Sequence, residues 1–583
     1  MRKCFRFALS RRGLTTAGLL VVVIAGFYVQ QNWTGRHAWE KYKEKLKAEG
    51  ENLDWNAYVP APVPDDQNIF AAPKIQQWFV KGQSSDLSIP PYPPGQSVEI
   101  ARVEVVGGEF KPESYDLILD DPRKVEVHST STTRDQVAVA IRKAARGRSL
   151  KSCIENTFIG GAVEGVVPTR ILVKAQDIPS CKDIGSLFRP ETIEAGFPGA
   201  KRVEVEALGS NSFSVYVPSV ISARDYLEWS DRLEPKLSMI RSALERPFSR
   251  MNGAYDVPFK IPIPNFIAVR QVSQILAQRA QCHLLVNEPD KALQDLTLLH
   301  KLSRLLEAGP GGKPMTLVAA MINVAITGVY ANTIGDGLRL HAWREPQLIE
   351  LQRELAEVNL PPLVAEAFRE ERAGVCHTLE TIAPTKLSLL LSGKASTTVW
   401  QKMRDPRFWL LSQMPRGWVY ENMITVASLD QGLLAGFGAR GVVQPKVVDE
   451  AMIHVGKTLG HFSPANFIAA QVVPNYLRAT RTTAYNQTMA NLALIACALE
   501  RYRAVHNAYP ISLEELTPGF IENVPSDVVM GIPLHYRLQD SGLYILYSVG
   551  WNGTDDGGHS ANAKPGFPGA IDEADWVWEA TRG

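Results

Sequence analysis

Cysteine is scarce in this sequence, and neither sign of charge is in excess. None of the six cysteines among 583 residues forms a CxxC pair, which excludes zinc-ribbon and thioredoxin-like sites. Lys plus Arg (62) nearly balances Asp plus Glu (61), so nothing in the charge favours nucleic acid as a partner. HExxH, GxSxG and EF-hand motifs are also missing. These absences exclude several common enzyme and metal-binding classes.

Acidic residues are missing before Glu40, and only one long apolar run stands out. This run, Gly13–Val29 (GLTTAGLLVVVIAGFYV), has about 17 residues, at the short end of what spans a bilayer as a helix. The basic residues that precede it are Arg2, Lys3, Arg6, Arg11 and Arg12. The positive-inside rule then places residues 1–12 in the cytoplasm. We expect one crossing of the inner (cytoplasmic) membrane, with the bulk of the chain periplasmic or extracytoplasmic.

The apolar run has four interpretations, of which a retained signal-anchor is favoured. Tyr28 and Trp33 suit an interfacial aromatic belt, and the small-x-small cleavage signal at 23–25 is poor. A cleaved signal peptide is the second interpretation. Residues 10–14 (SRRGL) also share features with a twin-arginine export signal, and residues 12–15 (RGLT) with a prepilin junction. Gly18 stands where pilins carry an acidic residue, which weakens the prepilin alternative.

The remaining cysteines divide into two groups. Cys153 and Cys181 are candidate disulfide partners in an oxidising compartment, and their bond would contribute about 3–4 kcal/mol. Cys282, Cys376 and Cys497 lie in helical patterns and are expected to be small buried hydrophobic residues.

The pattern along the chain predicts a multidomain α+β protein. Its segments are a basic N-terminus (1–12), the signal-anchor (13–29), a stalk and Pro-rich linker (30–95), a mixed α+β region (96–221), a largely helical domain (222–475) and a C-terminal α+β module (476–583). In the linker, Arg36–Gly50 would extend the membrane helix as a stalk, and Val59–Asp66 would form a stiff spacer. Ile69–Val80 is amphipathic and is expected to dock on a domain.

The two middle regions differ in the period of their apolar residues, which is that of strands in 96–221 and that of helices in 222–475. Alternation predicts strands at 98–106, 202–208 and 213–217, with a helix at 134–146. Helical spacing then predicts helices at 223–244, 266–285, 292–306, 315–334, 345–358 and 361–382. The pair 266–306 resembles one tetratricopeptide unit without a second copy, so an irregular helical array is expected. The small residues of 315–334 suit central burial.

An aromatic region follows between residues 383 and 475. Its aromatic and basic residues are Trp400, Phe408, Trp409 and Trp418 with Arg404, Arg407 and Arg416. They could lie against a membrane surface or a partner. Tryptophans packed in a core, with arginines at its rim, are the more common outcome and are expected here.

The last hundred residues carry an ordered set of short motifs. A helix at 489–503 leads to NAYP, then to SLEEL with Ser512 and Glu515 as a capping box, and to VPSD and GIPL. The strands 534–538 and 543–549 form a hairpin, and the chain continues as YSVGWNGTDDGG. This order resembles the globular domain of type II secretion major pseudopilins. It differs in that some 450 residues separate it from the membrane segment and in that Val528 replaces a usual proline.

The resemblance implies a calcium site, because the pseudopilin loop after Y-S-x-G binds calcium. The residues that match this loop and its surroundings are Asn552, Asp555 and Asp556, with Asp572 and Asp575 in the tail. Calcium prefers six to eight oxygen ligands, which carboxylates in a Gly-rich loop supply. The neutral Asn552 lowers the expected affinity, and a solvated acidic turn is the competing interpretation.

Catalytic patterns are weak. Val455–Thr458 (VGKT) is half of a phosphate-binding loop, but no strand or first glycine precedes it. His377 with Glu370, Glu371 and Glu380 is the best acid–base cluster, with Glu370 and His377 on one helical face. A charged helix face is the simpler interpretation.

The sequence favours a membrane-anchored binding or structural module that has an unidentified protein partner and is associated with a secretion or pilus-like system. An exported hydrolase, with its active site in the helical middle, is the alternative. A pocket that gathers several His, Asp or Glu side chains would favour the enzyme, and an open groove would favour binding.

Overall fold

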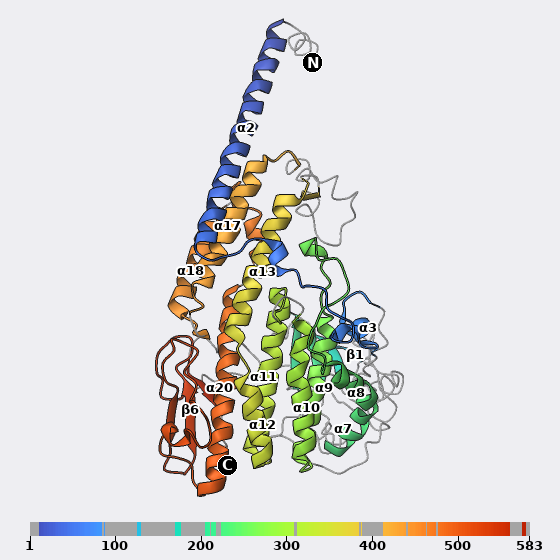
Figure 1. Ribbon diagram of the computed structural model, residues 1–583, viewed down its shortest axis with the longest axis vertical. Coiled ribbons are helices and arrows are strands. Elements are labelled where there is room, and N and C mark those ends of the chain that lie inside the picture. The colour runs from blue at the N-terminus through green and yellow to red at the C-terminus, as the bar shows by residue number, and fades with distance from the viewer. Residues whose placement is uncertain are drawn as a thin grey trace. The chain divides into compact units, whose positions relative to one another are not determined.

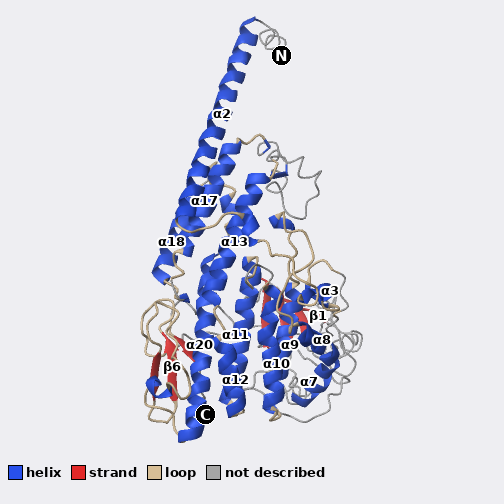
Figure 2. Ribbon diagram, viewed as in Figure 1, coloured by secondary structure: helices blue, strands red, loops and turns tan. Residues whose placement is uncertain are grey.

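The structure is a computed structural model of the chain. It describes residues 11–83, 87, 125–129, 170–175, 204–209, 212–216, 223–307, 312–383, 386–387, 412–438, 441–461, 463–473, 476–559 and 574–578. These residues are mostly helical, with two small antiparallel sheets (Figures 1 and 2), which confirms the α+β class. The chain divides into two compact units: Leu87–Leu237 with Gln278–Ala292, and the remainder.

The first sheet belongs to the smaller unit. Its strands, in the spatial order β1-β2-β4-β3, are β1 (Val125–Ser129), β2 (Arg170–Ala175), β4 (Ser212–Tyr216) and β3 (Glu204–Gly209), and all pairs are antiparallel. The predicted strands at 202–208 and 213–217 are confirmed by β3 and β4, whereas β1 and β2 were not predicted. The strand predicted at 98–106, the helix at 134–146 and the Cys153–Cys181 pair lie outside the described residues.

Helices make up most of the rest. They are α2 (Arg11–Ala48), α3 (Ile75–Phe79), α7 (Ala223–Ser230), α8 (Glu234–Ala243), α9 (Phe266–Leu285), α10 (Pro289–Leu302), α11 (Leu317–Arg339), α12 (Glu345–Ala356), α13 (Leu360–Thr381), α17 (Arg416–Leu434), α18 (Pro445–Leu459), α19 (Ala469–Val472) and α20 (Tyr476–His506). Short 3-10 turns are η1 (Trp55–Tyr58), η2 (Ile69–Ala71), η5 (Asp231–Leu233), η6 (Pro258–Lys260), η7 (Ser303–Leu306) and η9 (Leu513–Leu516). The predicted helices from 266 to 382 are confirmed with small changes at their ends.

The helix predicted at 223–244 is wrong as one element, because the structure divides it into α7, η5 and α8. Pro235 stands at the start of α8. A proline has no backbone N–H and clashes with the carbonyl one turn earlier, so a continuous helix through this position is disfavoured. The apolar spacing continues across the break, which explains why periodicity alone suggested one helix.

The larger unit is built around α11. Val324, Ala331 and Ile334 of this helix are completely buried, and α11 packs against α13 and α20. Glycine lets neighbours approach closely, since a Cβ at Gly335 would lie 3.1 Å from the Trp578 ring. The central burial predicted for 315–334 is confirmed. Cys282, Cys376 and Cys497 are free and buried, as predicted.

The sequence led us to expect no second apolar stretch long enough to cross a membrane. This prediction is wrong by length and composition, because α11 is such a stretch. Among the described residues it is the one helix with the length and composition of a span, but 67% of its most apolar window is buried inside the protein. Central helices of soluble proteins commonly have these properties. Length and apolarity alone are therefore weak evidence for a crossing.

The helix α2 runs without interruption from the apolar segment into the predicted stalk (Figure 1). The stalk is not free, because Trp39 and Leu46 are 1% exposed and pack in a cluster with α13 and α17. Gly35 and Gly417 lie where α2 crosses α17, and a Cβ at Gly417 would overlap the backbone of Gln31. The two helices therefore touch through their backbones, which only glycine permits at this crossing.

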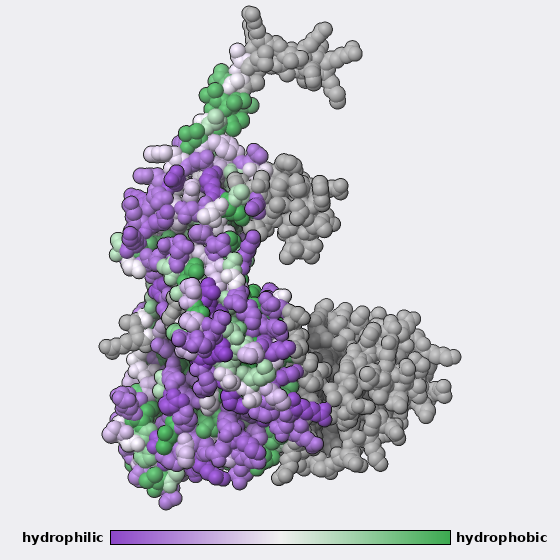
Figure 3. Space-filling model, turned by 45° about the vertical axis from the view of Figure 1, so that its right-hand side comes forward, coloured by the Kyte–Doolittle hydropathy of each residue, from purple (hydrophilic) through white to green (hydrophobic). Residues whose placement is uncertain are grey.

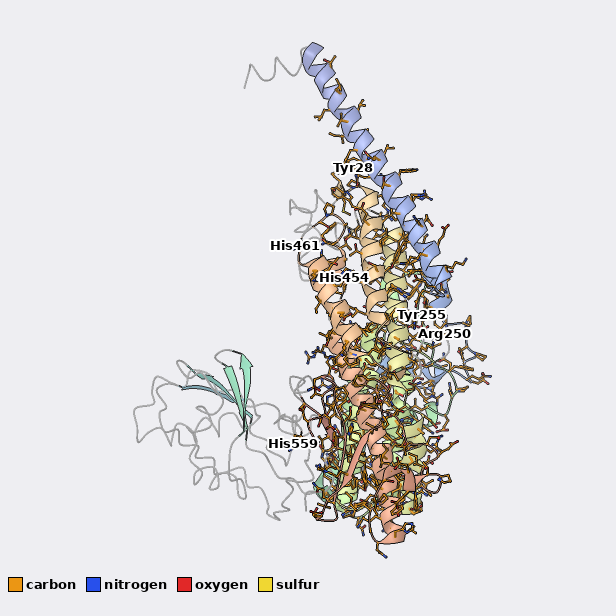
Figure 4. The ribbon with its side chains drawn as sticks, turned by 90° about the vertical axis from the view of Figure 1, so that its left-hand side faces the viewer. Tyr28, Arg250, Tyr255, His454, His461 and His559 are labelled. Carbon is orange, nitrogen blue, oxygen red and sulfur yellow. The ribbon has the colours of Figure 1, made fainter. Side chains whose placement is uncertain are left out.

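The segment after α2 is docked on the larger unit. Arg250 donates to the carbonyl of Pro60, so the predicted spacer at Val59–Asp66 lies against the protein. Arg250 also stacks over the Tyr255 ring at 5.1 Å (Figure 4). The docking predicted for Ile69–Val80 is confirmed by completely buried side chains such as Ile75.

The second sheet has the order β5-β6-β7, with β5 (His535–Leu538), β6 (Tyr544–Ser548) and β7 (Trp576–Trp578). The predicted hairpin is confirmed, and β7 was not predicted. The capping box is wrong in part, because the Ser512 side chain accepts no capping hydrogen bond from η9. The Glu515 carboxylate does accept from the Ile511 N–H at 3.0 Å.

The region between 383 and 475 is described only in part. Trp400, Arg404, Arg407, Phe408 and Trp409 lie outside the described residues. Trp418 is half-buried, and its indole N–H donates to Gln31 of α2. Arg416 donates to the carbonyl of Leu379 in the last turn of α13 and to that of Ile382, the residue that follows the helix. A cation at a helix C-terminus satisfies free carbonyl groups and the helix dipole.

Candidate functional site

The four residues of the predicted acid–base cluster all lie on α13 but face different partners. Glu371 accepts the N–H of Leu317 at the start of α11, and Glu380 pairs with Lys43 of α2 at 3.4 Å. Glu370 and His377 are two turns apart, or about 10 Å along the helix. The structure therefore does not assemble these residues into one catalytic group.

A polar cleft of about 490 Å³ lies where α2 ends beside α13 and η1. Its lining residues are Glu49, Gly50, Glu51, Asn52, Ala57, Tyr58, Glu366, Arg369 and Glu370. Of the predicted cluster, only Glu370 belongs to it. The volume lies within the range of small-molecule sites.

A helix cap positions one wall of the cleft. Gly50 ends α2 with a φ of +83°, a backbone conformation that glycine adopts at little cost. The N–H of Gly50 donates to the carbonyl of Lys47, and the N–H of Glu51 donates to the carbonyl of Leu46. This pair of bonds is a Schellman motif. It turns the chain at the end of α2 and brings Glu51 to α13.

Two arginines of α13 hold the Glu51 carboxylate. Arg369 donates to it at 3.2 Å, and the completely buried Arg372 forms a short ion pair with it. Burial opposes ionisation of Glu51, but Arg372 and Arg369 outweigh burial and lower its pKa. Arg372 also donates to Gln431 of α17 at 2.7 Å. This network ties the end of α2 to α13 and α17.

Two buried carboxyl groups at this network have oxygen atoms without a hydrogen-bond partner among the described residues. Glu370 is 1% exposed, and among the described residues its Oε2 has no partner. Burial raises its pKa to about 9, with Glu366 adding and Lys313 opposing. Asp430 of α17 is also 1% exposed, and neither of its carboxylate oxygens has a partner in the described parts of the chain.

Burial likewise raises the pKa of Asp430 to about 8, against the opposing charge of Arg372. Burial therefore favours the protonated, neutral form of both carboxyls. Buried polar atoms normally have partners, so these two groups need an explanation. Water or a ligand could supply the missing hydrogen bonds.

Sequence analysis missed Glu51, Arg369, Arg372 and Asp430. Two of them carried a signal, because they interrupt apolar faces at helical spacing. Arg372 lies four residues from the buried Phe368 and from the buried Cys376, where the pattern calls for an apolar residue. A charge on the buried face of a helix is costly unless it has a partner, so it indicates a network. Nothing local indicated Glu51.

The predicted calcium residues are only partly brought together. Asp575 accepts the N–H groups of Asp556 and Gly558, and Asp555 accepts the Tyr547 hydroxyl at 3.0 Å. The Asn552 side chain accepts the Thr554 N–H. Asp572 lies outside the described residues. Within the described residues no group of three or more His, Cys, Asp or Glu side chains is placed to hold a metal.

The phosphate-loop fragment at 455–458 lies within α18, so it forms no loop. The four described strands of the first sheet carry no side chain of the cleft. The candidate functional site therefore consists of the cleft at the end of α2 together with the Arg372–Asp430 network behind it. Comparison of the chain with protein-family models, with curated proteins and with solved structures returns no match.

Proposed function

We propose that this protein is a single-pass protein of the cytoplasmic membrane that holds a binding module outside the cytoplasm. The N-terminal half of α2, up to Val29, supports this. The side chains of Leu19, Val22 and Val29 are 67%, 69% and 70% exposed. Figure 3 shows this segment as an apolar stretch that extends beyond its neighbours. An exposed apolar surface of this length is costly in water and favourable in lipid.

The single observation that carries the proposal is the continuity of α2. One helix has exposed apolar residues up to Val29 and buried residues at Trp39 and Leu46. The anchor is therefore joined to the larger unit without a flexible linker. The cleft begins 20 residues after Val29, which corresponds to about 30 Å of helix. A binding site would thus lie at a fixed height above the lipid.

Aromatic residues mark the proposed lipid boundary. Tyr28 forms a short hydrogen bond with the carbonyl of Gln413 (Tyr28 is labelled in Figure 4). Trp33 is 70% exposed and stacks on His37 at 5.6 Å. Tyr and Trp are enriched at membrane interfaces. With the basic residues before Gly13, these positions support an orientation with the N-terminus in the cytoplasm.

We further propose that the protein is associated with a type II secretion or pilus-like system. Its support is the order of motifs in residues 489–558 and the α20–hairpin arrangement, in which Tyr485 of α20 contacts the Trp576 ring of β7 at 5.5 Å. The helix α20 also packs against α11 and α12. We therefore propose that this module presents its sheet to a partner rather than polymerising through its helix.

Membrane fractionation tests the proposal. We expect the full chain to sediment with membranes and to resist carbonate extraction. Val22→Asp places a charge in the anchor and should release most of the protein, because a charge at the centre of a span costs about 3 kcal/mol. Ile511→Asp is the matched control, since Ile511 is 81% exposed on the body. Carbonate extraction of the unmodified chain would refute the anchor.

An exported hydrolase is the second candidate, and one observation favours it. The cleft gathers Glu49, Glu51, Glu366 and Glu370, and burial raises the pKa of Glu370 to about 9, which favours its protonated form. A protonated carboxyl beside an ionised one is the arrangement of a general acid and its partner. Hydrolysis that falls above pH 9 and is lost in Glu370→Gln would establish this function. A flat pH profile would refute the role of Glu370.

A further inference from the structure

We infer that the start of α17 enters the lipid–water interface beside α2, so that the larger unit stands directly on the membrane surface. The inference rests on the proposed membrane anchor and adds a second contact, which the body of the protein makes with phospholipid. It follows from where α17 meets α2, from the length of the apolar run, and from the polar groups that pair at the contact.

The first residues of α17 meet α2 at the end of its apolar run. The Trp418 ring contacts the Phe27 ring edge-to-face at 6.3 Å, and the carbonyl of Gln413 accepts the Tyr28 hydroxyl. Later residues of α17 pack in one cluster with Trp39. The two helices therefore lie side by side and run in the same direction (Figure 1), and the N-terminal end of α17 lies nearest to the proposed span.

The apolar run is too short to cross the hydrocarbon core by itself. Residues 13–29 make about 25 Å of helix, whereas the core of a bilayer is about 30 Å thick. The uncharged stretch is longer, because it covers residues 13–35, between Arg12 and Arg36. We therefore expect the lipid boundary to lie about three residues beyond the apolar run, at residues 30–32.

Two polar side chains fall in this boundary layer, and α17 supplies their partners. The Gln31 side chain accepts the indole N–H of Trp418 at 3.1 Å, and the Asn32 side chain accepts the backbone N–H of Gly417 at 2.9 Å. A polar group that leaves water without a partner is costly, so these bonds lower the cost of placing Gln31 and Asn32 beside lipid. The bond to Gly417 also satisfies an N–H group in the first turn of α17, which has no acceptor within its own helix.

The aromatic residues at this level suit the interface. Trp418 is half-buried, with its ring against Phe27 and its N–H bonded, and tryptophan is enriched at membrane interfaces. Phe27 belongs to the proposed span and is 43% exposed, while Trp33, one turn beyond it, is 70% exposed. The contact with α17 thus continues directly from the apolar surface of the span. Phospholipid is the partner that fits this position, because it surrounds the proposed span.

Photo-crosslinking of the full chain tests the inference, in vesicles of phosphatidylethanolamine and phosphatidylglycerol. The photoreactive residue benzoylphenylalanine replaces Gln413, which is exposed and contacts Tyr28 through its backbone carbonyl rather than its side chain. Gln539 is the matched control, because it is an exposed glutamine in the turn between β5 and β6. Val22 is the reference position inside the proposed span. Mass spectrometry identifies lipid adducts after illumination.

We expect lipid adducts at positions 413 and 22 and none at 539. An adduct at 22 together with a protein crosslink or no product at 413 would overturn the inference and leave the proposed anchor standing. No lipid adduct at either position would overturn both. Equal lipid adducts at 413 and 539, or an adduct at 413 without one at 22, would also contradict the inference, because the contact would then not depend on the place of α17 beside the span.

Discussion

The outer half of α2 and the central helix α11 are both rich in Val, Leu, Ile, Ala and Gly, but their surroundings differ. In α11, Val324, Ala331 and Ile334 are completely buried by protein. In α2, Leu19 and Val22 are 67% and 69% exposed, and the helix meets the body only beyond them. A span criterion based on length and composition selects α11 rather than α2.

This comparison shows that two helices of similar apolarity can differ in whether protein covers them. Protein atoms cover α11, so it has no need of lipid. The exposed half of α2 has no such cover among the described residues, and basic residues stand before it in the sequence. The following predictions separate the helix that protein covers from the one that we propose lipid covers.

The largest effect is expected from a charge placed in α11, and the same charge placed in α2 is the comparison. Ala331→Asp buries an unpaired carboxylate in the core and should destabilise the protein by about 4 kcal/mol or more. Val22→Asp should change stability in detergent by less than about 0.5 kcal/mol, because the site is exposed. Chemical denaturation followed by tryptophan fluorescence measures both. Equal losses of stability would remove the distinction between the helices.

The second effect concerns the point where α2 joins the body. Gly417→Ala puts a Cβ into the backbone of Gln31, and we expect a loss of about 2–3 kcal/mol together with loosening of α2. Gly26→Ala is the matched control, because nothing lies within 4 Å of its Cβ and alanine favours a helix. Denaturation and the protease sensitivity of residues 30–48 report the outcome. An unchanged Gly417→Ala protein would contradict a backbone crossing.

A third effect is the pH dependence that Asp430 confers. Its pKa is raised from 3.8 to about 8, so the folded state holds this proton more tightly than the unfolded state. The free energy of unfolding therefore falls as pH rises between these values. Asp430→Asn removes the contribution of this group to the slope. The free energy of unfolding of the variant minus that of the unmodified chain should therefore increase by about 1 kcal/mol or more from pH 5 to pH 9.

Glu370 contributes in the same direction in both proteins, so it cancels in this difference. Arg372 remains paired with Glu51 in the variant. Denaturation at several pH values gives the slope directly. Parallel curves for the two proteins would show that Asp430 is ionised in the folded state throughout.

The smallest effect is expected from calcium. The resemblance to pseudopilins predicts that calcium raises the melting temperature by a degree or two, since Asn552 weakens the site and the gain is RT ln(1 + [L]/Kd). Asp555→Asn should remove the shift, whereas Asp540→Asn, in the β5–β6 turn, should not. An identical melting temperature in calcium and in chelator would exclude the site.

Local patterns predicted much of the helical architecture. The helix at 266–285 coincides with α9 because its apolar spacing is uninterrupted and a turn with a proline follows it. The strands β1 and β2 were missed since their partners lie far apart in the sequence, as β2 pairs with β1 on one side and β4 on the other. The same reason applies to β7, which joins β6 from the chain's end.

The candidate site was less accessible to sequence reasoning. The sequence correctly pointed to Glu370 as a candidate residue. It paired Glu370 with His377, however, whereas the structure places Glu370 in the lining of the cleft. Glu51 meets Arg372 across more than 300 positions of sequence. Only the fold brings such residues together, because contacts between distant segments leave no periodic trace. The usable signal was the interruption of apolar helix faces by Arg372 and by Asp430.

A reporter fusion tests the central claim most directly. Alkaline phosphatase, which is active only outside the cytoplasm, is joined after Gly583, and a fluorescent protein that matures only in the cytosol is joined in a parallel chain. We expect high phosphatase activity and no fluorescence, because the proposed single crossing at α2 would place the body outside. A silent phosphatase with a bright fluorescent fusion would contradict the account.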